Sequence, residues 1–178
     1  GVLSQYIGRK NAALVEMGRR WEAGQCGIVE EHAASEALRR GATSCAAEVA
    51  QPQGAPLAVL FTAEQERHTL GLFLAELVLA EMGWRVLLLG EGPPAEDLKP
   101  LVAQLKPDLL VVSASAASRA TALDGYVKAL VRAIEGRNAG LILAGGGTWR
   151  ARRPARRVES FRELRAFLEG RRRSQIRA

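Results

Sequence analysis

The sequence predicts an α/β fold, in which a doubly wound, parallel five-stranded sheet is preceded by a short helical bundle. Three observations lead to this. Short apolar runs alternate with longer segments of helical period from residue 57 onward. Runs such as Leu109–Val112 are apolar at every position, as strands covered on both faces are. The first fifty residues keep helical spacing, and a stretch rich in proline and glycine follows them.

The amino-terminal segment, residues 1–50, is predicted to form a helical bundle that acts as a lid. Its apolar positions recur at helical spacing, at Leu14, Met17, Trp21, Ile28, Val29 and Leu38. Gly24 and Gly27 predict a break between a first and a second helix, and Gly41 predicts another before a third. Residues 51–56 contain two prolines and a glycine, which predict a linker.

The rest of the chain, residues 57–170, is predicted to be one α/β domain of flavodoxin-like or Rossmann-like type, followed by a basic tail at 171–178. The expected strands are Leu57–Thr62, Arg85–Leu89, Asp108–Val112, Leu141–Ala144 and a short one near Val158. The expected helices are Thr69–Met82, Ala95–Leu105, Ala120–Glu135 and Ser160–Glu169. Ligands of such sheets bind outside the carboxyl ends of the strands, which directs attention to the loops there.

Composition excludes several classes of protein. Of the 178 residues 48% are hydrophobic, which is too many for a disordered chain. No apolar run reaches the roughly 18 residues of a membrane span, and no signal segment opens the sequence, so a cytoplasmic protein without membrane contact is expected. Two cysteines without CxxC spacing indicate neither a disulfide framework nor a zinc site.

The net charge of +6 is uneven, because the segment from Arg150 to Ala178 has eleven arginines and three glutamates. That segment could contact nucleic acid or an acidic partner, or could be a solvated face, and no recognisable reading helix accompanies it.

Three of the loops at strand ends carry unusual residues. Glu66 and His68 follow the first strand, Ser113 and Ser115 follow the third, and a run of three glycines from Gly145 follows the fourth. A lone histidine at a strand end is more often a structural hydrogen-bonding residue. The carboxylate of Glu66, two residues before His68, favours a role for His68 as a metal ligand, because a carboxylate can orient the imidazole. The sequence lacks GxGxxG, P-loop and GxSxG motifs.

The pattern Glu66-x-His68-x-x-Gly71, 41 residues, Ser113-x-Ser115, 29 residues, Gly145-Gly146 resembles the signature of the B12-binding domains of methionine synthase, the mutases and their relatives. The commonest first residue there is Asp, and Leu often stands where this chain has Ser115. The resemblance implies that His68 replaces the benzimidazole of cobalamin as lower axial cobalt ligand. It implies that the nucleotide tail enters between the sheet and a helix. The residues expected to contact the cofactor are Glu66, Thr69, Leu70, Gly71, Ser113, Ser115, Gly145 and Gly146.

Trp21, nine residues, then Glu31-His32 resembles an element of the cobalamin-dependent photoreceptors, the MerR-type CarH and LitR regulators. The resemblance implies that Trp21 covers the adenosyl group of adenosylcobalamin and that Glu31 hydrogen-bonds to it. His32 would help form the upper pocket and could become the upper cobalt ligand after photolysis. Taken alone, Trp21 and His32 would more often be core residues of a helix pair.

The sequence departs from that family in three ways. Glu22 stands where well-understood photoreceptors have a histidine, the helical part is short, and no winged helix-turn-helix precedes it. DNA binding would therefore come from a missing domain, a partner or the basic tail.

The resemblance implies a light-sensing module that is not an enzyme. It would control transcription through light-dependent assembly, as a homo-oligomer or with a regulatory partner. The alternative is a corrinoid methyl carrier of a methyltransferase system. A third reading, a flavodoxin-like response domain without cofactor, lacks the expected acidic cluster.

Overall fold

The computed structural model describes residues 27–49 and 52–176 together with residues 16, 19, 20, 23 and 25, apart from the side chains of 31 and 172–176. At its centre is a parallel sheet of five strands in the order β2-β1-β3-β4-β5. The strands are β1 (Leu57–Thr62), β2 (Arg85–Gly90), β3 (Leu109–Ser113), β4 (Gly140–Ala144) and β5 (Arg156–Val158). The first four predicted strands are confirmed with ends that agree to within a residue, and the short strand expected near Val158 is β5. The doubly wound α/β fold is confirmed with them.

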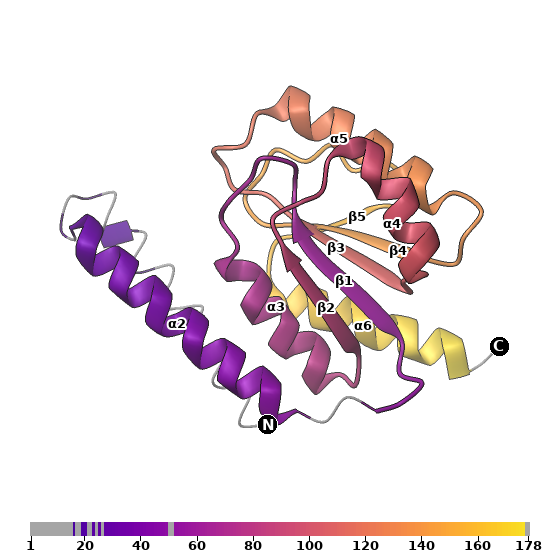
Figure 1. The fold of residues 1–178 in the computed structure, drawn as a ribbon, viewed down its shortest axis with the longest axis horizontal. Coiled ribbons are helices and arrows are strands. Elements are labelled where there is room, and N and C mark those ends of the chain that lie inside the picture. Colours follow the sequence, from indigo (N-terminus) through magenta and orange to yellow (C-terminus); the bar gives the residue numbers. More distant parts are fainter. Residues whose placement is uncertain are drawn as a thin grey trace.

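Helices cover both faces of the sheet (Figure 1). α3 (Leu70–Glu81) and α6 (Phe161–Ile176) pack on one face. α4 (Leu98–Leu105) and α5 (Ala120–Ile134) pack on the other, with a short 3-10 turn, η1 (Ala95–Asp97), before α4. Because both faces are covered, β1 and β3 are buried along nearly their whole length, which explains their unbroken apolar sequences.

α2 (Ile28–Glu48) is a single helix that packs its carboxyl-terminal half on α3. Its N-cap residue is Gly27, whose backbone N–H donates to the Glu30 carboxylate at 2.9 Å. The predicted break at Gly41 is wrong, because the helix continues through it. Neighbouring Ala42 is 0% exposed against the core, and this packing offsets the cost of a helical glycine, about 1 kcal/mol. Among the described helices none is both long and apolar enough to cross a membrane.

α6 also runs further than predicted, past Gly170 to Ile176, so most of the expected basic tail is helical. The guanidinium of Arg171 explains the extension. Its Nη2 donates to the carbonyl oxygens of Asp108 and Asn138, at 3.1 Å each, and so fastens this part of α6 to the amino-terminal ends of β3 and β4. The weak helix propensity of Gly170 is outweighed here by the long-range hydrogen bonds of Arg171.

Candidate functional site

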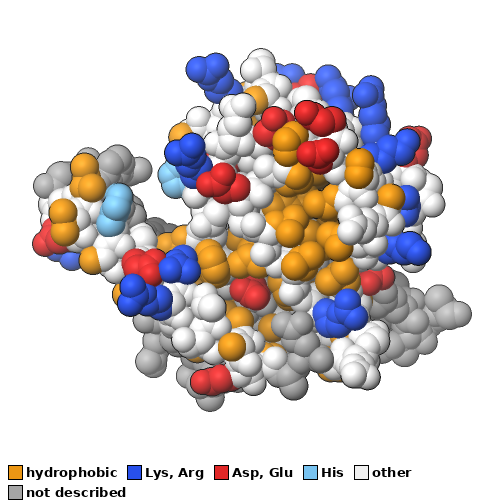
Figure 2. Space-filling view, viewed as in Figure 1, with side chains coloured by type: hydrophobic (Ala, Val, Ile, Leu, Met, Phe, Trp, Pro, Cys, Tyr) orange, Lys and Arg blue, Asp and Glu red, His pale blue; other side chains and the backbone are white. Residues whose placement is uncertain are grey.

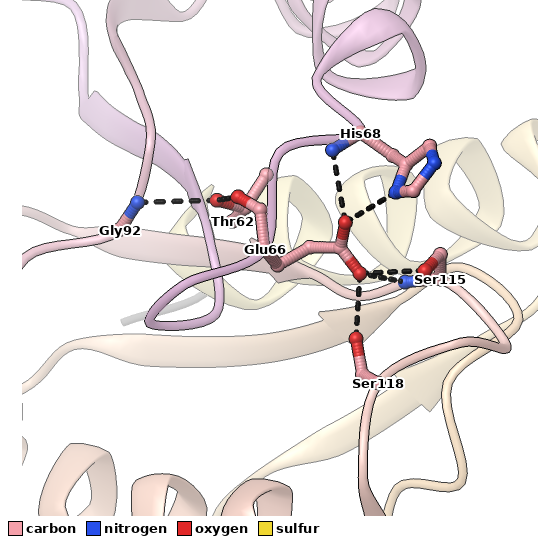
Figure 3. Close-up of polar contacts among 6 residues, drawn as sticks. All are labelled: Thr62, Glu66, His68, Gly92, Ser115 and Ser118. Carbon is pink, nitrogen blue, oxygen red and sulfur yellow. Dashed lines mark hydrogen bonds and ion pairs between the residues drawn. The ribbon is translucent and has the colours of Figure 1, made fainter.

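The buried carboxylate of Glu66 is the centre of a polar network at the carboxyl edge of the sheet (Figure 3). Its Oε1 accepts the backbone N–H of His68 at 2.9 Å and contacts the His68 ring Nδ1 at 2.5 Å. Its Oε2 accepts the Ser115 N–H at 2.9 Å, the Ser115 hydroxyl at 2.6 Å and the Ser118 hydroxyl at 2.5 Å. The carboxylate therefore joins the loop after β1 to the loop after β3.

These contacts fix which nitrogen of His68 is available to a ligand. An ionised carboxylate only accepts hydrogen bonds, so Nδ1 carries the proton that points at Glu66. In the neutral ring Nε2 then has a lone pair, and Figure 3 shows this nitrogen on the side away from Glu66. The His68 side chain is 74% exposed, whereas that of Glu66 is 5% exposed. The pair thus presents an oriented imidazole on a buried support, which is the arrangement of many metal-ligating histidines.

Hydrogen bonding keeps Glu66 ionised despite its burial. Burial alone would raise the pKa of its carboxyl group. The hydroxyls of Ser115 and Ser118, with the backbone N–H groups of His68 and Ser115, outweigh burial and hold the pKa well below its usual range.

Thr62, at the end of β1, braces the same loop. Its hydroxyl is fully buried, donates to the Glu66 carbonyl at 2.5 Å and accepts the Gly92 N–H at 3.1 Å. A Cβ on Gly92 would lie 2.0 Å from the Thr62 carbonyl oxygen, so only glycine fits there. Gln65 adopts a left-handed φ of 65° within the loop. The loop that carries His68 is therefore held from β1, β2 and β3.

A narrow cavity of about 200 Å³ lies between the sheet and the helices α3 and α6. Ser113 lines it, and the Ser113 hydroxyl is buried without a hydrogen-bond partner. Gly71 and Gly145 line it too, and most of the rest of its wall is apolar. A partnerless buried hydroxyl is costly, so its presence on a cavity wall fits a ligand that supplies the partner.

The three glycines after β4 have different roles. Gly145 has a φ of +84°, and a Cβ there would lie 2.5 Å from the Ala114 carbonyl oxygen. A Cβ on Gly147 would lie 2.8 Å from the Ala114 Cβ. Gly146 has room, since the nearest atom to its Cβ would be 3.6 Å away. Gly145 and Gly147 thus allow the loops after β3 and β4 to approach each other, whereas Gly146 is sterically unconstrained by the chain.

Next to His68 is an open depression of about 910 Å³. The loop after β1, the loop after β3 and the first turns of α5 line it, with Ser115, Ser118 and Tyr126 among the lining residues. Thr69 and Leu70 lie half-buried at the start of α3. A bulky group held by His68 would have room above the strand ends.

The expected upper-face residues lie on or before α2. Trp21 is outside the described residues, as is the side chain of Glu31, whose backbone belongs to α2. His32 is exposed on the amino-terminal half of α2. Figure 2 shows an open notch between this half of the helix and the α/β domain.

Three residues of the site are not among those that the sequence pattern indicates: Thr62, Gly92 and Ser118. Gly147 is the third glycine of the run after the fourth strand. The position of Ser118 in the sequence does indicate a site residue, because it follows Ser115 by three residues in the same loop after β3. A turn joins the two residues, in which the Ser118 N–H donates to the Ser115 carbonyl at 3.2 Å. The described residues hold no cluster of three or more histidines, cysteines or carboxylates suited to a bare metal ion.

The basic carboxyl-terminal segment is partly neutralised. Arg152 pairs with Asp124 at 3.2 Å and Arg157 with Glu159 at 3.1 Å. Arg156 and Arg157 are exposed on the edge strand β5. These contacts fit a solvated face as well as an anion-binding one.

The sequence is similar to those of two HTH-type transcriptional repressors. The chain is 34% identical over 126 residues to the HTH-type transcriptional repressor CarH of Myxococcus xanthus, covering 68% of this chain and 40% of that protein. It is 30% identical over 100 residues to the repressor CarA of the same organism, covering 56% of this chain and 33% of CarA. The chain therefore spans well under half the length of either relative. No protein-family model matches it.

Among solved structures, the monomethylamine corrinoid protein of Methanosarcina barkeri aligns with a TM-score of 0.69 at 21% sequence identity. The alignment covers 90% of this chain and 79% of that one. At this identity the likeness establishes a shared fold.

Proposed function

This chain has the fold of the B12-binding domains and is related to the repressor CarH, and on that basis we propose that it is a cobalamin-binding, light-sensing module that regulates transcription. The observation that carries the proposal is the His68–Glu66 pair. A proton fixed on Nδ1 leaves Nε2 of an exposed ring free to bind the cobalt of a preformed corrinoid. No cluster of three or more histidines, cysteines or carboxylates that could hold a metal ion occurs in the described part of the chain, which fits a preformed metal complex better than a bare ion.

The cavity beside Ser113 supports a binding mode in which the nucleotide tail of cobalamin enters the protein. The benzimidazole displaced from cobalt needs a place, and this cavity is mostly apolar with one buried hydroxyl that lacks a partner. Ser113 would donate to the nucleotide tail, and Gly71 and Gly145 would line its path. Gly146 would let the tail pass close to the backbone.

The upper face would be covered by the amino-terminal helical segment. Trp21 would pack against the adenosyl group, Glu31 would accept a hydrogen bond from it, and His32 would help form the pocket. Adenosylcobalamin, when bound, supplies a cobalt–carbon bond that visible light cleaves. The helical segment would contact the upper ligand in the dark and lose those contacts in the light. Light can shift the helical segment from its dark arrangement to its light arrangement only as far as the cofactor's affinities for the two arrangements differ.

Glu22 follows Trp21 where related photoreceptors have a histidine, so we propose His32 as the upper cobalt ligand after illumination. DNA contact would be made by a domain outside these residues, by a partner or by the basic carboxyl-terminal segment. The names of CarH and CarA as HTH-type repressors support a role in transcription.

The test is size-exclusion chromatography of the protein loaded with adenosylcobalamin, with absorbance spectra, before and after green light. We expect a spectrum of cobalamin with histidine in place of benzimidazole in the dark, conversion in the light, and a change in elution volume. The same protein loaded with hydroxocobalamin is the control and should elute alike in dark and light. Photolysis without any change in assembly or partner binding would refute the switch.

A corrinoid methyl carrier is the second candidate. The exposure of His68 and the open depression beside it favour a face that partner enzymes could reach. Methyl transfer from methylcobalamin on this chain to a thiol acceptor, with a partner methyltransferase present, would favour the carrier over the photoreceptor.

A further inference from the structure

The cavity between the sheet and the helices α3 and α6 has a wall that is apolar over most of its area. Neighbouring residues of three strands form its sheet side, because Ser113 of β3 pairs with Ala144 of β4, and Ala144 pairs with Val158 of β5. Paired residues point to the same face of a sheet, so these three side chains face the two helices. The wall side chains that are at most 5% exposed are all apolar: Leu72, Ala75, Val111, Val158 and Leu164.

Polar side chains on this wall are few, and one of them has an unused hydrogen bond. Glu159 is exposed and pairs with Arg157 at 3.1 Å, and the Ser160 hydroxyl accepts the backbone N–H of Glu163 at 3.2 Å. The Ser113 hydroxyl is buried and has no partner within the part of the chain that the structure describes. A group that enters this cavity therefore meets apolar side chains and one buried hydroxyl that can donate to it.

The lower bases of cobamides, the class of cofactor to which cobalamin belongs, differ in how many polar atoms they carry. The dimethylbenzimidazole of cobalamin has one ring nitrogen besides the nitrogen bonded to ribose, and the rest of the base is apolar. The adenine of adeninylcobamide has two further ring nitrogens and an amino group. A polar atom that is buried without a partner weakens binding, whereas burial of apolar atoms strengthens it. The wall therefore matches a base with a single free ring nitrogen.

We propose that this cavity selects cobamides with a benzimidazole lower base and discriminates against those with a purine. The Ser113 hydroxyl would donate to the free ring nitrogen of the benzimidazole, and the two methyl groups of that base would lie against apolar side chains. A purine would bury further polar atoms that the wall leaves without partners. This inference rests on the proposed binding of cobalamin and names the member of that cofactor class that the chain takes.

Binding titrations in the dark with the adenosyl forms of cobalamin and adeninylcobamide test the proposal. We expect the parent to bind adeninylcobamide at least about tenfold more weakly, because one buried polar group without a partner has an effect of that size. Adenine is the weaker base and holds cobalt less tightly in the free cofactor, which favours the binding of adeninylcobamide with a histidine on cobalt. The difference between the free cofactors therefore cannot produce the expected preference.

Val158→Thr is the informative variant, because it adds a hydroxyl to the cavity wall and keeps nearly the shape of valine. A purine then finds a partner, and we expect the preference for cobalamin to narrow about threefold or more. The matched control, Val86→Thr, makes the same change at a half-buried position of β2 that does not line the cavity, and should keep the preference of the parent. Adenosylcobinamide, which has no nucleotide tail, should bind equally to the parent and Val158→Thr. Circular dichroism should show both variants folded.

The outcomes separate this inference from the proposed function. Equal affinity of the parent for the two cobamides would overturn the selectivity and leave cobalamin binding in place. A preference of the same size in Val158→Thr and in the parent would show that it does not arise at this wall, and would also overturn the inference. If neither cobamide binds, the cobalamin-binding function is wrong and the inference falls with it.

Discussion

Nδ1 of His68 lies 2.5 Å from Oε1 of Glu66, and this contact fixes how the imidazole can bind a ligand. The opposite oxygen of the same carboxylate is held by two serine hydroxyls and a backbone N–H. The ring cannot turn without losing its hydrogen bond, and the carboxylate cannot follow it without losing three more. The orientation of an exposed histidine is thus set by a buried network.

Replacing Glu66 by glutamine should destabilise the protein. The amide group has two N–H donors where the carboxylate has only acceptors, so at least one donor would face another donor, either Ser115 N–H or His68 N–H. We expect a loss of about 1–3 kcal/mol in the free energy of unfolding, measured with urea. Glu64→Gln, an exposed change in the same loop, should alter it by less than about 0.5 kcal/mol. Equal stability of the two variants would contradict this account of the network.

The stabilising effect of Glu66 should depend on pH. The pKa of its carboxyl in the folded protein lies below the ordinary value of 4.5, so the unfolded chain takes up a proton first as the pH falls. The contribution is therefore complete above about pH 4.5 and is lost as the pH falls through the folded-state pKa. Urea unfolding at several pH values should show the stability difference between the parent and Glu66→Gln narrowing in acid. A difference that stays constant would show that the charge of Glu66 does not stabilise the fold.

Ser113→Ala should affect stability and binding in opposite directions. Removing a buried hydroxyl that has no partner should leave the free protein as stable or more stable, by up to about 1 kcal/mol. If this hydroxyl holds the nucleotide tail, the same variant should bind cobalamin roughly tenfold more weakly, the effect of losing one hydrogen bond. Thermal unfolding and a binding titration measure the two effects. Unchanged affinity would remove Ser113 from the binding site.

Gly145→Ala and Gly146→Ala should differ. The first forces a Cβ to within 2.5 Å of the Ala114 carbonyl oxygen at a left-handed φ, and should cost about 1–3 kcal/mol of stability. The second meets no atom closer than 3.6 Å and should change stability little. Weaker cobalamin binding by the stable Gly146→Ala protein would indicate that the tail passes there. Similar stabilities for the two variants would contradict the steric argument.

Much of the fold could be predicted from local sequence. The central strands β1, β3 and β4 are runs of apolar residues buried on both faces, so their limits follow from where polarity returns, as at Thr62 and Ser113. Helix ends were harder to predict. Gly41 and Gly170 are weak helix formers, yet both lie inside helices because Ala42 and Arg171 make contacts with distant elements.

The site could be predicted as residue types and spacing, but not as a set of contacts. The pattern linked Glu66 to His68 because they are two residues apart. The bond from Ser118 to Glu66 spans 52 residues, and the bond from Gly92 to Thr62 spans 30. Such pairs depend on how neighbouring strand ends align in the sheet, which local sequence does not reveal.

The most direct test of the central claim is the dark absorbance spectrum of the protein titrated with adenosylcobalamin, beside that of His68→Ala. If Nε2 of His68 binds cobalt, the parent should give the spectrum of cobalamin with histidine in place of benzimidazole. His68→Ala should lose that spectrum and bind more weakly while remaining folded, because the His68 ring is exposed and its removal leaves no cavity in the core. Equal affinity and identical spectra for the two proteins would contradict the assignment of His68 as the cobalt ligand.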